Sequence, residues 1–219
     1  MDIKKILGKP LVIMLGATNK GKTMALAQII SEYKKNYHGK VWTYGIKKQI
    51  TDELKTERFE SLETLETIKN SFIVIDEVGR IFDLDDRKQK KMIDTTLRKI
   101  SHNGNLILLS GLPTDFKKFL SAKADIFLFK GLRIADLING SMAKETVLNY
   151  EGELKGSYVL DVPVNEILCF NGNYWVEKVA YDERFDTKKD NVSLFLERLP
   201  FCEKSVEENK PAELCEEKE

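Results

Sequence analysis

The sequence predicts an α/β fold in which a parallel sheet lies between helices and continues into an antiparallel extension. Two observations predict the parallel part: short, continuously apolar runs alternate with stretches of helical periodicity, and the connections between them are short. A third predicts the extension, because beyond about residue 142 the chain changes to short β-like runs broken by turn residues.

Five apolar runs are expected to form the parallel core. A run that is apolar throughout is typical of a strand buried on both faces, as in a parallel sheet. Helices are expected from Lys22 to Lys35, after a Ser61 cap, over Arg87–Ile100 and, as a short element, around Phe116. The five expected strands are Pro10–Leu15, Val41–Tyr44, Ser71–Ile75, Leu106–Leu109 and Asp125–Phe129.

One domain is expected over residues 1–202, because a single hydrophobic core stops growing only at about 250 residues. Its core covers about 10–140, its β-hairpin extension about 142–180 and a terminal helix about 190–200. Hairpin turns are expected at Gly152-Glu153 and Asn171–Asn173. The β-like runs of the extension are Thr146–Tyr150, Gly156–Leu160 and Tyr174–Val176.

Composition indicates an ordinary soluble chain, 42% apolar and 32% charged with a formal net charge of zero. Residues 203–219 carry seven Glu and three Lys, which predicts an acidic, disordered tail. The chain opens with charged residues, and its three cysteines form no CxxC pair, so a cytoplasmic location is expected. No apolar stretch approaches the roughly 20 residues of a membrane-spanning helix, so no membrane anchor is expected.

The segment between the first strand and the first helix matches G-x-x-x-x-G-K-[ST] at every fixed position. Its glycines permit a tight turn whose amides point inward, and the helix start adds a positive dipole end. Lys22 is expected to bridge the β and γ phosphates of ATP, and the Thr23 hydroxyl to ligate Mg²⁺. The residues expected to hold the nucleotide are Gly16, Ala17, Thr18, Asn19, Lys20, Gly21, Lys22, Thr23 and Met24.

An acidic pair follows the third expected strand. Asp76 is expected to complete the magnesium shell, and Glu77 to act as the base that polarises a water molecule. Glu77 directly after Asp76 resembles the additional-strand, catalytic-glutamate division of P-loop ATPases. The resemblance implies a P-loop NTPase three-layer sandwich with sheet order 5-1-4-3-2, in which another strand separates the loop strand from the acidic strand.

Ser110 ends that intervening strand, so its hydroxyl is expected to face the γ-phosphate. Oligomeric ATPases of this kind usually receive an arginine from a neighbouring subunit, which stabilises the transition-state charge. Arg98, at the end of the basic helix, is the first candidate, and Arg80 and Arg133 are alternatives.

The features after the acidic pair resemble the HerA and FtsK class of DNA-pumping ATPases. The resemblance covers about residues 10–160 and rests on Leu97–Gly104, Leu106–Pro113, Ala124–Phe127 and the Gly152–Tyr158 segment. By size the nearest branch is the small genome-packaging ATPases of archaeal viruses, together with Zot-like phage proteins. It implies a homo-oligomeric ring that translocates or packages double-stranded DNA in the host cytoplasm, with a capsid or portal component as a further partner. The sensor glutamine of the class would fall near Leu112, so Ser110 and Arg98 are assigned by position.

Two other functions stay open, a DNA-associated loader or partition-type ATPase and a small-molecule kinase. A kinase needs an arginine-bearing lid, and no lid-like insertion follows the fourth expected strand. The basic segments Arg87–Lys91, Lys117-Lys118 and Lys188-Lys189 fit contacts with phosphodiester backbones, but equally fit solvated helix faces.

Overall fold

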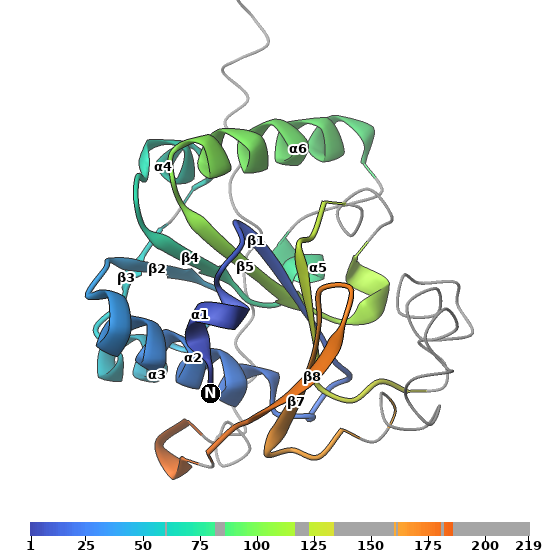
Figure 1. The fold of residues 1–219 in the computed structure, drawn as a ribbon. Coiled ribbons are helices and arrows are strands. Elements are labelled where there is room, and N and C mark those ends of the chain that lie inside the picture. Colours follow the sequence, from blue (N-terminus) through green and yellow to red (C-terminus); the bar gives the residue numbers. More distant parts are fainter. Residues whose placement is uncertain are drawn as a thin grey trace, which may run out of the picture.

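The computed structural model describes residues 1–59, 61–81, 86–116, 123–133, 160, 162–180 and 182–185. Within them an eight-stranded sheet lies between two layers of helices (Figure 1). The strands are β1 (Leu11–Leu15), β2 (Val41–Tyr44), β3 (Glu57–Arg58), β4 (Phe72–Ile75), β5 (Leu106–Gly111), β6 (Ile126–Phe129), β7 (Glu166–Phe170) and β8 (Tyr174–Lys178). The helices are α1 (Ile3–Ile6), α2 (Lys22–Tyr37), α3 (Lys48–Glu53), α4 (Leu62–Thr67), α5 (Val78–Ile81) and α6 (Arg87–His102), with 3₁₀ turns η1 (Pro113–Asp115) and η2 (Glu183–Phe185).

The strand order is β3-β2-β4-β5-β1-β6-β7-β8. The five expected core strands are β1, β2, β4, β5 and β6, all paired in parallel, so the expected order 5-1-4-3-2 is confirmed. The expected antiparallel extension is confirmed as well, since β7 pairs antiparallel with β6 and with β8. The expected turn at Asn171–Asn173 joins β7 to β8.

Several short elements were not predicted from the sequence: α1, α3, α5, β3 and β7. Elements of two to six residues are too short to show a clear period. The short helix expected from Phe116, Phe119 and Leu120 lies outside the described residues after Phe116, and the 3₁₀ turn η1 directly precedes the buried Phe116. The expected run Thr146–Tyr150, most of Gly156–Leu160, the terminal helix and the acidic tail lie outside the described residues.

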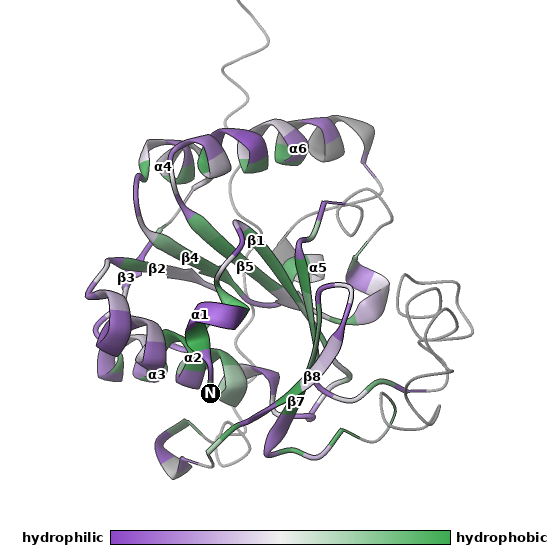
Figure 2. Cartoon of the chain, viewed as in Figure 1, coloured by the Kyte–Doolittle hydropathy of each residue, from purple (hydrophilic) through white to green (hydrophobic). Residues whose placement is uncertain are grey.

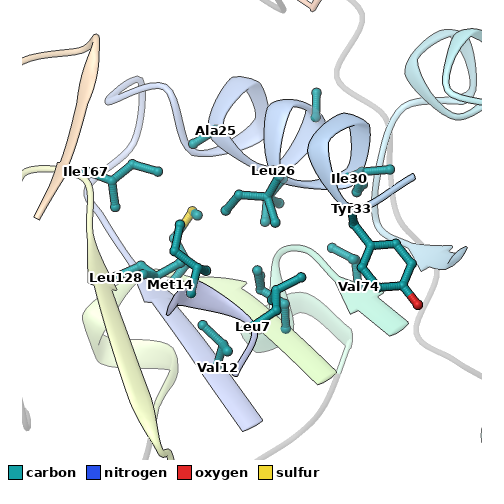
Figure 3. Close-up of a cluster of buried hydrophobic side chains, with 14 of the residues drawn as sticks. Leu7, Val12, Met14, Ala25, Leu26, Ile30, Tyr33, Val74, Leu128 and Ile167 are labelled. Carbon is teal, nitrogen blue, oxygen red and sulfur yellow. The ribbon is translucent and has the colours of Figure 1, made fainter. Parts of the chain in front are cut away.

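Both faces of the central strands β1, β4 and β6 are buried, because alternate residues of each strand point to opposite layers. Val12 and Met14 of β1 face α2, where Leu26 and Ile30 pack over them (Figure 3). Leu11, Ile13 and Leu15 face the layer formed by α4 and α6. Figure 2 shows the result, an apolar sheet between helices whose outer sides are hydrophilic.

The carboxyl ends of β1, β4, β5 and β6 meet at one edge of the sheet. Leu15 at the end of β1 is level with Gly111 of β5 and with Phe129 of β6. Ile75 at the end of β4 is level with Leu109. The residues that follow these strand ends are therefore brought together, and α2 begins at the same edge.

Candidate functional site

The glycine-rich loop is fixed to both strands beside β1. The amide of Gly16 donates to the carbonyl of Gly111 at 3.3 Å, and the amide of Ala17 donates to the carbonyl of Gly131 at 2.8 Å. A Cβ on Gly16 would lie 2.9 Å from the Cβ of Lys130, closer than side chains pack, so glycine is required there. Thr18 and Asn19 are exposed at the tip of the loop.

The loop turns into α2 through Gly21, whose φ of 78° places it in the left-handed region that favours glycine. Gly21 brings no side chain to cap the helix, so the site suits an anion at the positive end of the helix dipole. Lys20 lies against Gly131. Met24 is buried in the core, so its contribution to the site comes from its backbone.

Lys22 is a buried lysine whose amine points into the loop. Its Nζ donates to the carbonyls of Gly16 at 2.9 Å and Ala17 at 3.1 Å, and the residue is 7% exposed. Burying an ammonium group is costly unless it is paired. Carbonyl oxygens meet this need here, and phosphate oxygens in the same cradle would meet it better because they carry charge.

Asp76 lies at the end of β4, buried and opposite the loop. Its Oδ2 accepts a hydrogen bond from Thr23 Oγ1 at 3.2 Å, and its Oδ1 accepts one from the amide of Glu77 at 3.0 Å. Burial raises the pKa of the Asp76 carboxyl, and the charge of Glu77 adds to the rise, whereas Ser110 and Lys22 oppose it. The loop and the acidic strand are thus joined through Thr23 and Asp76.

Glu77 is half-buried and has a φ of 57°, a left-handed backbone that non-glycine residues rarely adopt. Such a conformation costs about 1–2 kcal/mol for an L residue. The chain therefore turns sharply between β4 and α5 at the residue expected to act as the base. Backbone strain of this kind concentrates at functional sites.

Ser110 is fully buried on β5, level with Met14 of β1 and one residue beyond the Ile75–Leu109 pair. Its hydroxyl therefore lies between the loop strand and the acidic strand, as expected. It lies close enough to the Asp76 carboxyl to lower the pKa of that group, but its Oγ makes no hydrogen bond of good geometry among the described residues. A buried hydroxyl without a partner costs free energy, so a ligand group at this position would be favoured.

The donors present fit a magnesium ion bound together with a nucleotide. Thr23 Oγ1 and Asp76 Oδ2 are 3.2 Å apart. Adjacent oxygens around Mg²⁺, each at about 2.1 Å, lie at about this separation. The described residues hold no cluster of three His, Cys, Asp or Glu side chains that could bind a metal ion alone. Magnesium commonly takes one or two protein ligands and completes its shell with phosphate and water oxygens.

Arg98, the first candidate arginine, does not join this cluster within one chain. Arg98 lies near the end of α6, toward the amino ends of the strands, and its side chain is 68% exposed and paired with Asp94 at 3.2 Å. Lys123 also pairs with Asp94, and together the two cations lower the pKa of that carboxyl. Arg133 is exposed, and the side chain of Arg80 lies outside the described residues. A role for Arg98 at a phosphate loop would therefore require a neighbouring subunit, and this role stays a prediction.

The basic segments expected to meet a phosphodiester backbone are only partly described. The backbone of Arg87–Lys91 is helical as the start of α6, and Lys91 is exposed. The other two segments, Lys117-Lys118 and Lys188-Lys189, lie outside the described residues.

Sequence reasoning missed three residues that shape the site. Gly45, with a φ of 78°, lies so close to Asp76 that any Cβ would collide with the Asp76 carbonyl oxygen. Asp115 of η1 accepts from the amide of Leu112 at 2.7 Å and lies against Gly79, just after Glu77. Lys130, after β6, lies behind the glycine-rich loop. Only Gly45 carried a local signal, a glycine directly after an expected strand.

Solved structures of other proteins share the fold of this chain. In sequence, no family model and no curated protein matches. B204, the DNA-packaging ATPase from Sulfolobus Turreted Icosahedral Virus, matches with a TM-score of 0.57 and 14% identity, over 78% of this chain and 97% of that one. The genome packaging NTPase B204 from Sulfolobus turreted icosahedral virus 2 matches with TM-scores of 0.57 in complex with AMPPCP and 0.55 in complex with ATP-gammaS. Identity is 14% in both, over 78% of this chain and 98% of B204.

The chain has the P-loop NTPase fold. The likeness to B204 spans nearly the whole of that viral protein, so the expected resemblance to small viral packaging ATPases is confirmed at the level of structure. At 14% identity it shows the fold alone.

In the part of the chain that the structure describes, none of the helices is long and apolar enough to span a membrane.

Proposed function

We propose that this chain is a magnesium-dependent ATPase that acts as a ring-forming motor and translocates or packages double-stranded DNA in viral genome packaging. One observation carries the ATPase part: Lys22, Thr23 and Asp76 converge at the carboxyl edge of the sheet, with Glu77 next to Asp76. The DNA part is supported by the fold likeness to B204 over 97% of that chain.

Each residue has a role that its position supports. The loop amides and the start of α2 hold the phosphates, and Lys22 pairs with their negative charge. Thr23 and Asp76 hold Mg²⁺, which would neutralise charge on the β- and γ-phosphate oxygens. Glu77 orients and deprotonates the attacking water, and Ser110 donates to the γ-phosphate. Arg98 of a neighbouring subunit supplies positive charge as the reaction proceeds.

Nucleotide binding is the first test of this proposal. Lys22→Ala should abolish detectable ATP binding, measured by calorimetry with ATP and Mg²⁺, because the loop loses its buried cation. Lys35→Ala is the matched control, since Lys35 lies in the last turn of the same helix and is 65% exposed. Equal ATP affinity in wild type and Lys22→Ala would overturn the assignment of the loop.

The partner is tested by the ATPase rate with double-stranded DNA, single-stranded DNA and no DNA, at two salt concentrations. The motor proposal expects the strongest stimulation by double-stranded DNA, decreasing with salt because phosphate contacts release counterions. The rate per subunit should also rise with protein concentration. Stimulation by DNA with no dependence on concentration would favour the loader. Phosphoryl transfer to a small molecule would favour the kinase.

A further inference from the structure

Lys130 is a buried lysine that the proposed ATPase chemistry does not use. It follows β6 directly, and its side chain is fully buried. Its Nζ donates to the carbonyl of Val164 at 2.6 Å and to the carbonyl of Glu166 at 2.7 Å. These carbonyls belong to the segment that begins β7, so the amine fastens the start of the antiparallel extension. Such a costly buried amine calls for an explanation beyond strand pairing.

The rest of the Lys130 side chain lies against the back of the glycine-rich loop. Its Cβ is 2.9 Å from the position that a Cβ on Gly16 would take, and its Cε is 3.8 Å from the equivalent position on Gly21. A Cγ of Val164 is 3.3 Å from that same position on Gly21. Backbone hydrogen bonds also join this segment to β1 and to the loop. The amide of Lys130 donates to the carbonyl of Leu15, and the amide of Ala17 donates to the carbonyl of Gly131. Gly16 therefore packs against Lys130, and Gly21 packs against both Lys130 and Val164.

We propose that Lys130 is a positioning residue that fixes the phosphate-binding loop against the start of the extension and adds positive charge behind the bound phosphates. The inference rests on the proposed ATPase function and deepens it. Lys130 does not touch the reacting atoms. It holds Val164 and the loop glycines in one arrangement, so a change in the loop on nucleotide binding reaches β7 through the same contacts.

The charged groups around Lys130 define how its charge responds to pH. Burial lowers the pKa of its amine to about 8, and the charge of Glu166 on β7 opposes this effect. On the loop side, Lys22 lies against Gly16, and Lys20 lies against Gly131. Bound phosphates add negative charge nearby, so nucleotide binding should favour the protonated amine. By linkage, nucleotide affinity should fall as pH rises through about 8.

The first experiment compares full-length wild type with Lys130→Met, which keeps the apolar stem and removes the amine. ATP–Mg²⁺ affinity and KM should worsen on the order of 10- to 100-fold, as expected when one charged group that favours phosphate binding is lost, with a smaller change in kcat. Lys178→Met, an exposed lysine on β8, is the matched control and should behave as wild type. Equal affinity in Lys130→Met and wild type overturns the proposal.

The second experiment repeats the ATP-affinity measurement from pH 6.5 to 9.5. Wild type should lose affinity through about pH 8, whereas Lys130→Met should lack this transition. Glu166→Gln should move the transition to lower pH, because it removes the carboxylate that favours the charged amine. A Lys130→Met variant that binds weakly but keeps the wild-type pH profile would show only a packing role and overturns the proposal.

Two other variants test the role of Lys130 if Lys130→Met does not fold. Val164 is 47% exposed, so Val164→Ala should fold and should weaken ATP binding in the same direction by removing the contact with Gly21. Glu166→Gln supplies the shifted pH profile. Wild-type behaviour of both variants overturns the inference alone. Absence of ATP binding by wild type itself would instead overturn the proposed function.

Discussion

The two edges of the sheet treat buried polar groups in opposite ways. At the amino edge, Asn105 is buried and fully bonded: its Oδ1 accepts from the amide of Ser71, and its Nδ2 donates to the carbonyls of Ile68 and Ile100. Asn103 donates to the carbonyls of Glu66 and Ile68 in the same network. These bonds tie α4, α6, β4 and β5 together.

At the carboxyl edge the arrangement of the polar groups costs folding free energy. The buried hydroxyl of Ser110 makes no hydrogen bond of good geometry among the described residues, although it lies near the Asp76 carboxyl, and Glu77 has a left-handed backbone. Burial raises the pKa of Asp76. This difference marks the carboxyl edge as the functional edge of the sheet, because polar groups that serve only the fold are satisfied within the fold. Groups that await a ligand are left short of partners or strained.

The largest effect on activity is expected at Arg98. This residue lies toward the amino edge of the sheet, yet it is proposed to act in the nucleotide site of a neighbouring subunit. An arginine supplied in trans is worth on the order of 1,000- to 100,000-fold in kcat, so Arg98→Ala should nearly abolish DNA-stimulated ATPase activity while ATP binding persists. Steady-state kinetics at saturating ATP would measure this.

Mixing Arg98→Ala with Glu77→Gln subunits should restore some activity at mixed interfaces, since each variant contributes the group that the other lacks. If Arg98→Ala keeps wild-type turnover, the amino edge is purely structural. Arg80 and Arg133 would then be tested in its place.

Glu77→Gln should reduce kcat by about 100- to 10,000-fold, the usual contribution of a general base. ATP affinity should stay within a few-fold of wild type, because the phosphates are held by the loop and by Lys22. The unfolding midpoint should not change, since glutamine keeps the same backbone and nearly the same shape. Glu32→Gln, at a half-buried glutamate of α2 whose side chain pairs with Lys35, is the control. A loss of affinity equal to the loss of kcat would contradict this division of roles.

The features predicted correctly from the sequence were those carried by neighbouring residues. An unbroken apolar run reveals a buried parallel strand, and the Gly16–Thr23 motif lies within eight residues of chain. The sheet order came from the resemblance suggested by Asp76 and Glu77. Lys130 could not be predicted, because its partners Val164 and Glu166 lie 34 and 36 residues further along and meet it only through the pairing of β6 with β7. The left-handed backbone of Glu77 was equally hidden, since nothing in the sequence marks it.

Asn105→Ala should destabilise the fold by about 2–3 kcal/mol, because it leaves the buried Ser71 amide without its Asn105 acceptor and removes one donor from each of the Ile68 and Ile100 carbonyls. Urea unfolding followed by circular dichroism would measure the change. The kcat and KM for ATP should remain near wild type at temperatures where the variant is folded. A variant that keeps its stability but loses turnover would contradict the view that the polar groups of the amino edge serve only the fold.

The smallest effect is expected for Ser110→Ala. The substitution should lower turnover, whereas stability should stay the same or rise. The buried hydroxyl of Ser110 makes no hydrogen bond of good geometry within the described residues, so removing it should leave the free energy of unfolding unchanged or raise it by up to about 1 kcal/mol. Turnover should nevertheless fall about tenfold, the value of one hydrogen bond of about 1.5 kcal/mol to a charged phosphate group. The urea midpoint and kcat, measured on the same preparation, decide between the two readings. If Ser110→Ala lost stability as Asn105→Ala should, its hydroxyl would belong to the fold. Unchanged stability with reduced turnover would instead mean that this buried hydroxyl is kept for the ligand, which is the property that separates the two edges.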